Sequence, residues 1–273
     1  MSICAIFKNE NIFLREWIEY HRLLGIDHFY MYNNNSNDDY LTVLQPYIEE
    51  GVVTLINWEM EQGQIGAYQD WYNKYRSETR WVTFIDIDEF ICLRNDRSIG
   101  DWLKRRENYP CILMYWKMFG TSAKEFHDYE RLVTEQYVVS WNRLGPLGKT
   151  FFNCRYDIAA WDETSHHFTL TKLKVFGIDF ILPPMNEYGF FIRKGISRGL
   201  NKKNNTIQLN HYWSKAWNEY AKKMNRSDVF YKDNPKRRIN YFLNFENNNI
   251  ATDYTIYRFL IQLKHKMKDI DFQ

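Results

Sequence analysis

Residues 86–89 (Asp-Ile-Asp-Glu) place three carboxylates within four positions, directly after the apolar run at residues 81–85. The apolar run predicts a buried strand, and on an extended chain Asp86 and Asp88 point to the same side. Two carboxylates on one side repel each other unless a positive charge lies between them. Oxygen ligands suit Mg²⁺ or Mn²⁺, which keep coordination positions open for phosphate oxygens. The segment therefore predicts a divalent-metal site, and the alternative is a solvated turn that happens to be acidic.

The first 85 residues are predicted to alternate between strands and helices. The strands are expected at residues 2–7, 28–32, 52–58 and 81–85, and the helices at residues 12–24, 41–49 and 66–76. Such an alternation is typical of a parallel α/β sheet, whose ligands bind beyond the carboxyl ends of the strands. Polar clusters follow three of the strands, at residues 8–10, 33–39 and 86–89. We therefore expect these clusters to converge on one edge of one site.

The rest of the chain has a less regular pattern. A strand is expected at residues 112–117, a mixture of short strands and loops from 119 to about 200, and helices at 218–224, 240–243 and 254–268. The sequence contains no internal repeat and no proline- or serine-rich linker. One compact domain over residues 1–273 is therefore predicted.

The composition excludes several classes of protein. The 36 Lys and Arg nearly balance the 34 Asp and Glu, so bulk charge does not indicate a nucleic-acid partner. No apolar stretch approaches the roughly 18 residues of a transmembrane helix, and Lys8 and Glu10 interrupt what would be the core of a signal peptide. The four cysteines are widely spaced, which is typical of reduced thiols rather than of a zinc ribbon or a disulfide framework. A cytoplasmic protein is expected.

Five motifs stand out along the chain. They are Lys8-Asn9-Glu10 with Glu16-Trp17 and His21, Tyr32-Asn33-Asn34-Asn35-Ser36, residues 81–90, Phe119-Gly120-Thr121-Ser122, and Asn210-His211-Tyr212-Trp213-Ser214-Lys215. Together these motifs resemble glycosyltransferase family 92 and related bacterial glycosyltransferases of the GT-A fold. The motifs follow the family's order across residues 3–226. Two positions depart from the family pattern, namely Ala123, where glycine is frequent, and residues 225–227, where Arg-Gly is usual. The resemblance implies an α/β fold of the GT-A, Rossmann-like type, with a mixed, mostly parallel central sheet flanked by helices.

The resemblance also implies a division of the chain and a metal site. Residues 1–118 would bind the nucleotide sugar, residues 119–240 would form the acceptor side, and residues 241–273 would be a C-terminal helical segment. Asp88 would ligate the metal, and Asp86 would contact the ribose or reach the metal through water. In GT-A enzymes a late histidine often completes the metal site, and His211 is the matching residue here. Because imidazole suits Mn²⁺ better than Mg²⁺, Mn²⁺ is the expected cofactor.

The nucleotide sugar is expected to lie against the loops that follow the first two strands. The residues expected to line its pocket are Lys8, Asn9, Glu10, Asn33 and Asn34. Asn and Glu side chains hydrogen-bond base edges and ribose hydroxyls, and backbone amides meet phosphate. Ordinary turn chemistry is the alternative for these residues.

A late basic segment is expected to meet the diphosphate. Lys215 lies four residues after His211, and a cation there would stabilise the charge that grows as the glycosidic bond breaks. Lys222, Lys223 and Arg226 are further candidates within residues 193–240, which contain 13 Lys or Arg and 3 Asp or Glu. A solvated basic face is the alternative for most of these side chains.

The catalytic base is open to several assignments. An inverting transferase needs a carboxylate that deprotonates the acceptor hydroxyl. The candidates are Asp162 and Glu163, together with Glu125 and Asp128. Surface charge is the alternative for each of them. A retaining mechanism would need no such base, and the sequence does not exclude it.

These observations together predict a metal-dependent glycosyltransferase. It would move a sugar from a nucleotide-sugar donor, expected to be a UDP-sugar, to a hydroxyl of a glycan or a lipid-linked acceptor. The role expected from the resemblance is the synthesis of cell-surface polysaccharide or lipopolysaccharide. The alternative is a non-catalytic nucleotide-sugar or glycan-binding module on the same fold, although the intact Asp86, Asp88 and His211 argue against it. No nucleic-acid partner is expected.

The segment at residues 254–268 combines an apolar stripe with several lysines. Phe259, Leu260 and Leu263 fall near one face of the expected helix. A basic amphipathic helix can contact an anionic membrane, such as the inner face of the plasma membrane, where lipid-linked acceptors would sit. A helix that packs on the domain is the alternative.

Overall fold

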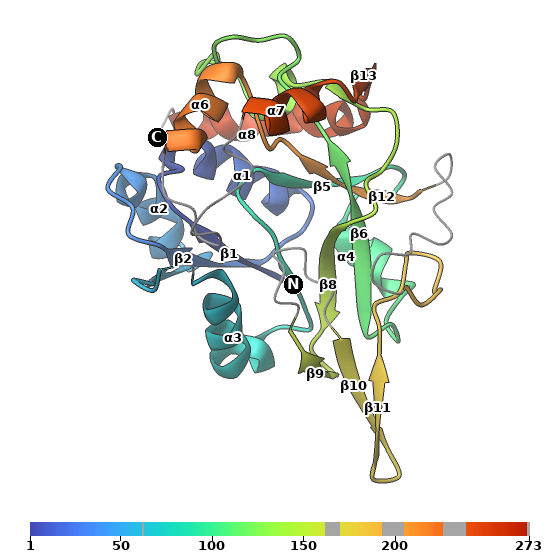
Figure 1. Cartoon of the computed structure of the whole chain (residues 1–273). Helices are drawn as coiled ribbons and strands as arrows, with labels where there is room; N and C mark the ends of the chain where they lie inside the picture. Colours follow the sequence, from blue (N-terminus) through green and yellow to red (C-terminus); the bar gives the residue numbers. More distant parts are fainter. Residues whose placement is uncertain (62, 162–169, 193–204, 226–238, 272–273) are drawn as a thin grey trace.

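A computed structural model describes residues 1–61, 63–161, 170–192, 205–225 and 239–271 of the chain. These residues form a mixed α/β fold around a sheet of eight strands in the order β3-β2-β1-β4-β8-β6-β12-β5 (Figure 1). The strands are β1 (Ser2–Phe7), β2 (His28–Asn33), β3 (Val53–Asn57), β4 (Trp81–Phe84), β5 (Glu89–Leu93), β6 (Cys111–Met118), β8 (Gly148–Asn153) and β12 (Ile207–His211). The α/β class with a mostly parallel central sheet, as expected from the sequence, is confirmed.

One half of the sheet is parallel. Strands β3, β2, β1 and β4 run in the same direction, and their connections contain the helices α1 (Asn11–Leu23), α2 (Tyr40–Glu49) and α3 (Gln64–Tyr75), followed by the 3-10 turn η1 (Arg76–Glu78). The carboxyl ends of the strands therefore share one edge. At this edge the Asn9 amide donates to Ser36 Oγ at 3.0 Å, and the Asn34 amide donates to the Phe7 carbonyl at 2.9 Å. The expected convergence of the loops after β1 and β2 is confirmed.

Side chains of β1 alternate between the two faces of the sheet, because successive residues of a strand point in opposite directions. Ile3 shares a core cluster with Trp17 of α1, whereas Cys4 shares a second cluster with Trp71 of α3. All four side chains are fully buried. Helices α1 and α3 thus cover opposite faces of the parallel strands.

The other half of the sheet is mixed. Strand β8 lies between β4 and β6 and is antiparallel to both. Strand β12 lies between β6 and β5, parallel to the first and antiparallel to the second. This arrangement pairs His211 with Glu89 across β12 and β5, although the two residues are far apart in the sequence.

The remaining elements lie around this sheet. A three-stranded sheet has the order β11-β10-β9, and β13 pairs with β7. These elements are α4 (Ile99–Lys104), α5 (Val133–Gln136), β7 (Val139–Trp141), β9 (Asp157–Ala160), β10 (Leu170–Val175), β11 (Ile178–Leu182), α6 (Trp217–Asn225), α7 (Ile239–Glu246), β13 (Asn249–Thr252), the 3-10 helix η3 (Thr255–Phe259) and α8 (Leu260–Asp271). None of the helices in the described parts of the chain has the length and apolar character that a membrane span requires.

Several sequence-based expectations are wrong in detail. A strand, β5, begins at Glu89, the last residue of the acidic segment, and neither it nor α4 was anticipated. The stretch from 254 to 268 is a 3-10 helix followed by α8 rather than a single helix. Its apolar residues Phe259, Leu260 and Leu263 are buried, and two of them belong to the core cluster that contains Trp17 of α1. This face packs on the domain and is therefore not available for the expected membrane contact.

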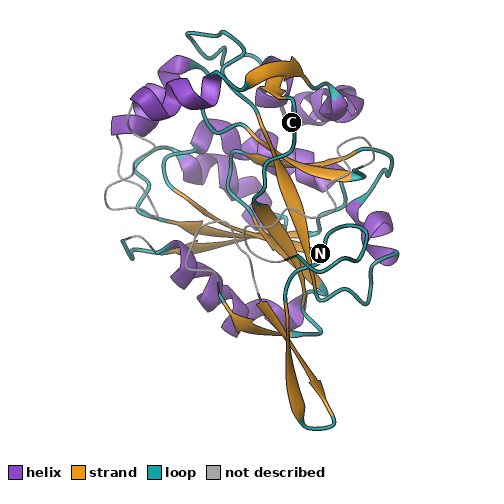
Figure 2. Cartoon of the chain, turned by 45° about the vertical axis from the view of Figure 1, so that its right-hand side comes forward, coloured by secondary structure: helices purple, strands orange, loops and turns teal. Residues whose placement is uncertain are grey.

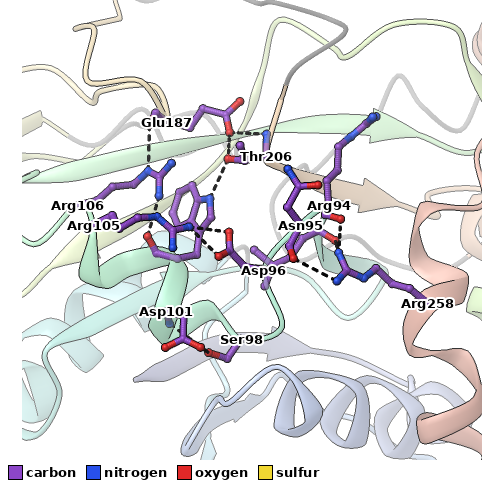
Figure 3. Close-up of polar contacts among 12 residues, drawn as sticks. Arg94, Asn95, Asp96, Ser98, Asp101, Arg105, Arg106, Glu187, Thr206 and Arg258 are labelled. Atoms are coloured by element: carbon purple, nitrogen blue, oxygen red, sulfur yellow. Dashed lines mark hydrogen bonds and ion pairs between the residues drawn. The ribbon is translucent and has the colours of Figure 1, made fainter.

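A network of polar contacts holds the loop after β5, at the end of that strand remote from Glu89 (Figure 3). The Arg258 guanidinium donates to the Asn95 carbonyl at 3.3 Å. Arg105 pairs with Asp96 at 2.7 Å. These contacts fix one end of β5 and thereby support the strand that begins with the acidic segment.

Gly148, at the start of β8, has no room for a side chain. A Cβ there would lie 1.8 Å from the Met114 carbonyl oxygen of the neighbouring strand. We expect Gly148→Ala to lower the free energy of unfolding by about 1–3 kcal/mol, because the backbone of β8 or that of β6 would have to shift to make room for the methyl group. Gly100 in α4 is the matched control, since the nearest atom to its Cβ would be 3.7 Å away and alanine is the better helix former. Urea unfolding of both variants is the measurement, and equal midpoints would contradict the expectation.

Candidate functional site

The acidic segment forms a tight turn between β4 and β5. The Glu89 amide donates to the Asp86 carbonyl at 3.0 Å, and the Asp86 amide donates to Glu89 Oε2 at 2.9 Å. The turn is closed by both its backbone and a buried carboxylate. Asp86 and Asp88 are therefore held at the carboxyl edge of the sheet, beside the loops that follow β1 and β2.

The Asp86 carboxylate is fixed through both of its oxygens. Gln64 Nε2, at the start of α3, donates to Oδ1 at 2.8 Å. Lys149 Nζ, on β8, donates to Oδ2 at 3.0 Å. The carboxylate keeps partial exposure, with 34% of its side-chain surface accessible. This arrangement orients Asp86 for contact with a ligand hydroxyl more readily than for direct coordination of a metal.

Lys149 is fully buried and brings a positive charge to two carboxyl groups of the turn, those of Asp86 and Glu89. Its Nζ also lies 3.9 Å from Glu89 Oε2, and neither side chain is exposed. Burial raises the pKa of Glu89 well above its usual range, while the charge of Lys149 opposes that rise. Burial alone would lower the pKa of Lys149, but Asp86 and Glu89 outweigh burial and raise it. The lysine therefore remains charged and holds the turn together.

Asp88 contacts His211 and Lys223. Its Oδ1 lies 3.5 Å from His211 Nε2, and its Oδ2 accepts a 2.5 Å hydrogen bond from Lys223 Nζ on α6. Burial would raise the pKa of Asp88, but Lys223 and His211 outweigh burial and hold that pKa well below its usual range. The Tyr212 amide donates to the Asp88 carbonyl at 2.8 Å, which fixes β12 against the turn. Asp88 is thus ionised and lies next to the positively charged Lys223.

The donor atoms of Asp88 and His211 suit a divalent cation. An oxygen and a nitrogen 3.5 Å apart can both reach one ion with bonds of about 2.1 Å. The Trp116 ring lies against the imidazole, with centroids 4.9 Å apart, and restricts its rotation. In the residues that the structure describes, no three His, Cys, Asp or Glu side chains are grouped closely enough to hold a metal. Mg²⁺, for example, is commonly bound by one or two carboxylates together with substrate phosphates and water.

Two motif residues on α1 act as scaffold for this site. The Trp17 indole donates to the Glu89 carbonyl at 2.8 Å, and the Ile91 amide donates to His21 Nε2 at 3.3 Å. Burial lowers the pKa of His21 to about 3, so the ring is neutral and able to accept. The other ring nitrogen, Nδ1, then donates to the Trp17 carbonyl at 2.8 Å. Both residues hold β5 in place beneath the acidic turn.

The expected nucleotide-binding residues lie at the carboxyl edge of the sheet. The side chains of Asn9, Asn33 and Asn34 form hydrogen bonds with neighbouring loop residues there. Asn9 has a positive φ of 55°, and its Oδ1 accepts from the Asn37 amide at 2.9 Å. Asn33 donates to Tyr40, and Asn34 donates to the carbonyls of Trp58 and Met60. Lys8 and Glu10 lie on the same loop after β1, and Glu10 is buried. Nucleotide contacts by these five residues stay a prediction.

Lys215 lies beneath the site rather than on its surface. The residue is buried and has a positive φ of 52°. Its Nζ lies 4.1 Å from the centroid of the Phe13 ring, which is a cation–π contact. Its charge contributes to the low pKa of Asp88. Contact of Lys215 with a diphosphate stays a prediction.

The candidate catalytic bases are only partly described. Asp162 and Glu163 lie outside the described residues. Glu125 is exposed, on the loop whose carbonyls accept hydrogen bonds from the start of α6. Asp128 is exposed, and its Oδ1 accepts from the Glu130 amide at 3.0 Å, which is turn chemistry. The assignment of a base therefore stays open.

Sequence reasoning missed two residues that shape the site, Gln64 and Lys149, and considered Trp116 only as an aromatic near the acceptor region. The Trp116 indole donates to Glu89 Oε1 at 2.6 Å, so all three contact the acidic turn. The one available signal was Lys149 itself, because a lysine directly before Thr-Phe-Phe in an apolar strand has to be neutralised when it is buried. Its partner lies 63 positions away in the sequence, a pairing that only the sheet order defines.

Comparisons with known proteins give consistent matches. The family model described as Glycosyltransferase family 92 matches residues 1–241. The protein RCOM_0530710 of Ricinus communis, named as a member of that family, is 24% identical over 241 residues, covering 85% of this chain and 38% of the relative. The family 92 protein Os08g0121900 of Oryza sativa subsp. japonica is 33% identical over 113 residues, covering 41% of this chain and 19% of the relative.

A further relative has a specific activity in its name. The galactan beta-1,4-galactosyltransferase GALS3 of Arabidopsis thaliana is 32% identical over 106 residues, covering 35% of this chain and 21% of the relative. The chain thus spans less than two fifths of the length of these three curated relatives. Among solved structures, residues 1–349 of TarS from S. aureus match with a TM-score of 0.38 and 12% identity, covering 56% of this chain and 46% of that chain.

Proposed function

The chain belongs to glycosyltransferase family 92, and from this premise we propose that it is a metal-dependent glycosyltransferase. It transfers a sugar from a UDP-sugar to a hydroxyl of a glycan or a lipid-linked acceptor. The observation that carries the proposal is the pairing of Asp88 with His211 at the carboxyl edge of the sheet, at 3.5 Å. The chain spans less than two fifths of the length of its curated relatives, so the activity of a whole family 92 protein is carried over to it only as part of this proposal.

In this proposal, Asp88 and His211 hold Mn²⁺ at the site. When bound, the cation supplies Lewis-acid stabilisation of the charge that develops on the departing diphosphate. Asp86, oriented by Gln64 and Lys149, accepts a hydrogen bond from the ribose. The cationic side chains of Lys215 and Lys223 add positive potential around the phosphates.

The donor sugar is proposed from the relatives. GALS3 and GALS2, at 32% identity each, are named galactan beta-1,4-galactosyltransferases. UDP-galactose is therefore the first donor to test, and an inverting reaction with Asp162, Glu163 or Glu125 as base is the proposed mechanism. Synthesis of cell-surface polysaccharide or lipopolysaccharide is the proposed role.

The function is tested by incubating the protein with Mn²⁺ and, separately, UDP-galactose, UDP-glucose and UDP-N-acetylglucosamine. Release of UDP, slow with water and faster with an oligosaccharide acceptor, is the expected result with one of these donors. Chelation of the metal should abolish the release. Tight binding of a donor with no UDP release from any of them would favour the non-catalytic module instead.

Lys223 and a metal ion compete for the same carboxylate, because the ammonium lies 2.5 Å from Asp88 Oδ2. We expect Lys223→Met to raise the affinity for Mn²⁺ without nucleotide by about three- to tenfold, a change of about 0.7–1.4 kcal/mol for a partly exposed pair. Free Mn²⁺ is measured by electron paramagnetic resonance. Lys222→Met is the matched control, since Lys222 pairs with Glu219 at 2.6 Å on the same helix. Equal Mn²⁺ affinities of the two variants would contradict the competition.

A further inference from the structure

The hairpin formed by β10 and β11 extends away from the body of the protein (Figures 1 and 2). It follows β9, which comes after β8 at the end of the sheet where β4 begins, because Trp81 pairs with Asn153. That end is opposite to the carboxyl edge that carries Asp88. The hairpin is therefore a feature separate from the candidate catalytic site.

The register of the hairpin gives it one apolar face and one mostly charged face. Val175 pairs with Ile178 and Leu173 pairs with Phe180, so these four side chains lie on the same face. All four are exposed to solvent. An exposed apolar sheet face of this kind is unusual on a protein surface that contacts only water.

The opposite face carries the charges of the hairpin. Lys174 pairs with Asp179 and Lys172 pairs with Ile181 in the strand register. Lys172 also forms an ion pair with Asp179 at 2.7 Å. The single acidic group is thus neutralised within the hairpin, and the remaining charge on this face is positive.

The tip of the hairpin carries exposed apolar side chains. Phe176 is completely exposed, with a relative accessibility of 101%, and Ile178 has a relative accessibility of 62%. Phe176 and Gly177 both have a positive φ, of 49° and 84°, and make the tight turn. A glycine at position 176 would avoid the backbone strain of this positive φ. Turn formation therefore does not explain why a phenylalanine is present there.

We propose that this hairpin inserts its tip into the surface of an anionic phospholipid bilayer. A rise of about 3.4 Å per strand residue places Lys174 about 7 Å from the tip and Lys172 about 14 Å from it. Interfacial elements bury their apolar groups to a depth of about 5–10 Å. At that depth Phe176, Val175 and Ile178 reach the acyl boundary. Lys174 lies at the level of the lipid phosphates together with its register partner Asp179, which is neutralised by Lys172.

The geometry favours a bilayer over a second copy of the chain. A protein partner would cover one face of the hairpin, whereas a bilayer surrounds the tip, including Phe176 at its end. Exposed aromatic side chains of Tyr188, Phe190 and Phe191 lie near the start of β6, at the same end of the sheet. Aromatic rings are typical of the membrane–water interface. The proposal does not depend on the transfer reaction.

The test is flotation of the full chain with vesicles of phosphatidylcholine, with and without phosphatidylglycerol. We expect binding to the anionic vesicles that falls at least about tenfold in Ile178→Ser, because one large apolar group is lost from the inserted tip. Ile261→Ser on α8 is the matched control, since Ile261 has a similar relative accessibility of 67%. Lys174→Glu should remove the preference for phosphatidylglycerol. Circular dichroism checks that each variant is folded.

Three results would overturn the proposal. The first is no binding of the wild-type chain to either kind of vesicle. The second is an equal loss in Ile178→Ser and Ile261→Ser, which would point to the C-terminal helix or to a general surface effect. The third is a dimer by sedimentation that Ile178→Ser converts to a monomer without any vesicle binding, which would make a second copy the occupant.

Discussion

Replacement of Asp88 by asparagine is expected to lower the affinity of the protein for Mn²⁺ by at least about 100-fold. Loss of a group that only supports a metal ligand costs 10- to 100-fold in metal affinity, so loss of a ligand's charge should cost at least as much. The pKa of Asp88 is held well below its usual range. The carboxylate is therefore fully charged at neutral pH, and the amide removes that charge without changing its shape.

Mn²⁺ binding to the Asp88→Asn variant is measured by electron paramagnetic resonance. The matched control is Asp157→Asn, because Asp157 forms an exposed ion pair with Arg76 at 2.6 Å, away from the acidic turn. Thermal unfolding checks that both variants are folded. If Asp88→Asn bound Mn²⁺ as well as the control did, Asp88 would not be the metal ligand.

Replacement of Lys149 by methionine is expected to lower the free energy of unfolding by about 3–5 kcal/mol, the cost of removing one partner of a buried ion pair. Lys149 is fully buried and its Nζ lies 3.0 Å from Asp86 and 3.9 Å from Glu89. Without the ammonium, Asp86 loses its ion-pair partner, and Glu89 loses the positive charge that opposes the rise of its pKa. Methionine keeps most of the volume, so the loss reports charge rather than a cavity.

The effect of Lys149→Met should depend on pH. Burial raises the pKa of Glu89 above its usual value of 4.5, so the folded protein binds a proton that the unfolded chain has released. The contribution of Glu89 to stability therefore falls as the pH rises from about 4.5 through its raised pKa, and it falls more steeply in the variant, which lacks the opposing charge of Lys149. The difference from wild type should shrink as the pH is lowered toward that value.

Urea unfolding at several pH values measures both parts of this expectation. Lys104→Met is the control, because Lys104 is exposed and its ion pair with Asp101, at 3.0 Å, joins two solvent-exposed side chains and contributes little to stability. A loss in Lys149→Met no larger than in this control, or one that does not change with pH, would contradict the role assigned to the buried lysine.

The parallel half of the sheet could be predicted from the sequence because its signals are local. Each strand from β1 to β4 is a short apolar run, and each helix between them has its apolar residues at helical spacing. In the rest of the sheet only β6 was expected, at residues 112–117, and the strand order could not be predicted, because β8 and β12 are placed by long-range pairing. The strand β8 comes from the second half of the sequence and lies between β4 and β6. The predicted division at residue 118 remains a prediction about function.

The candidate site, like the sheet, could be predicted from the sequence only in part. The cation site was predicted from Asp86 and Asp88 pointing to one side of an extended chain, but residues 86–89 form a turn. The two carboxylates have different partners, Lys149 for Asp86 and His211 with Lys223 for Asp88. His211 was expected from the family resemblance, and the pairing of β12 with β5 explains its position beside Asp88. Lys149 and Lys223 reach the two aspartates from β8 and α6. Their roles depend on tertiary packing, which no local pattern encodes.

The most direct test of the central claim is a calorimetric titration of UDP into the wild-type protein, with and without Mn²⁺. The account predicts binding of one UDP per chain that requires Mn²⁺, because Asp88 and His211 supply only part of the coordination and the diphosphate supplies more. Binding that is equally tight after chelation of the metal would contradict metal dependence. No binding under either condition, with the protein folded, would contradict the UDP-sugar donor.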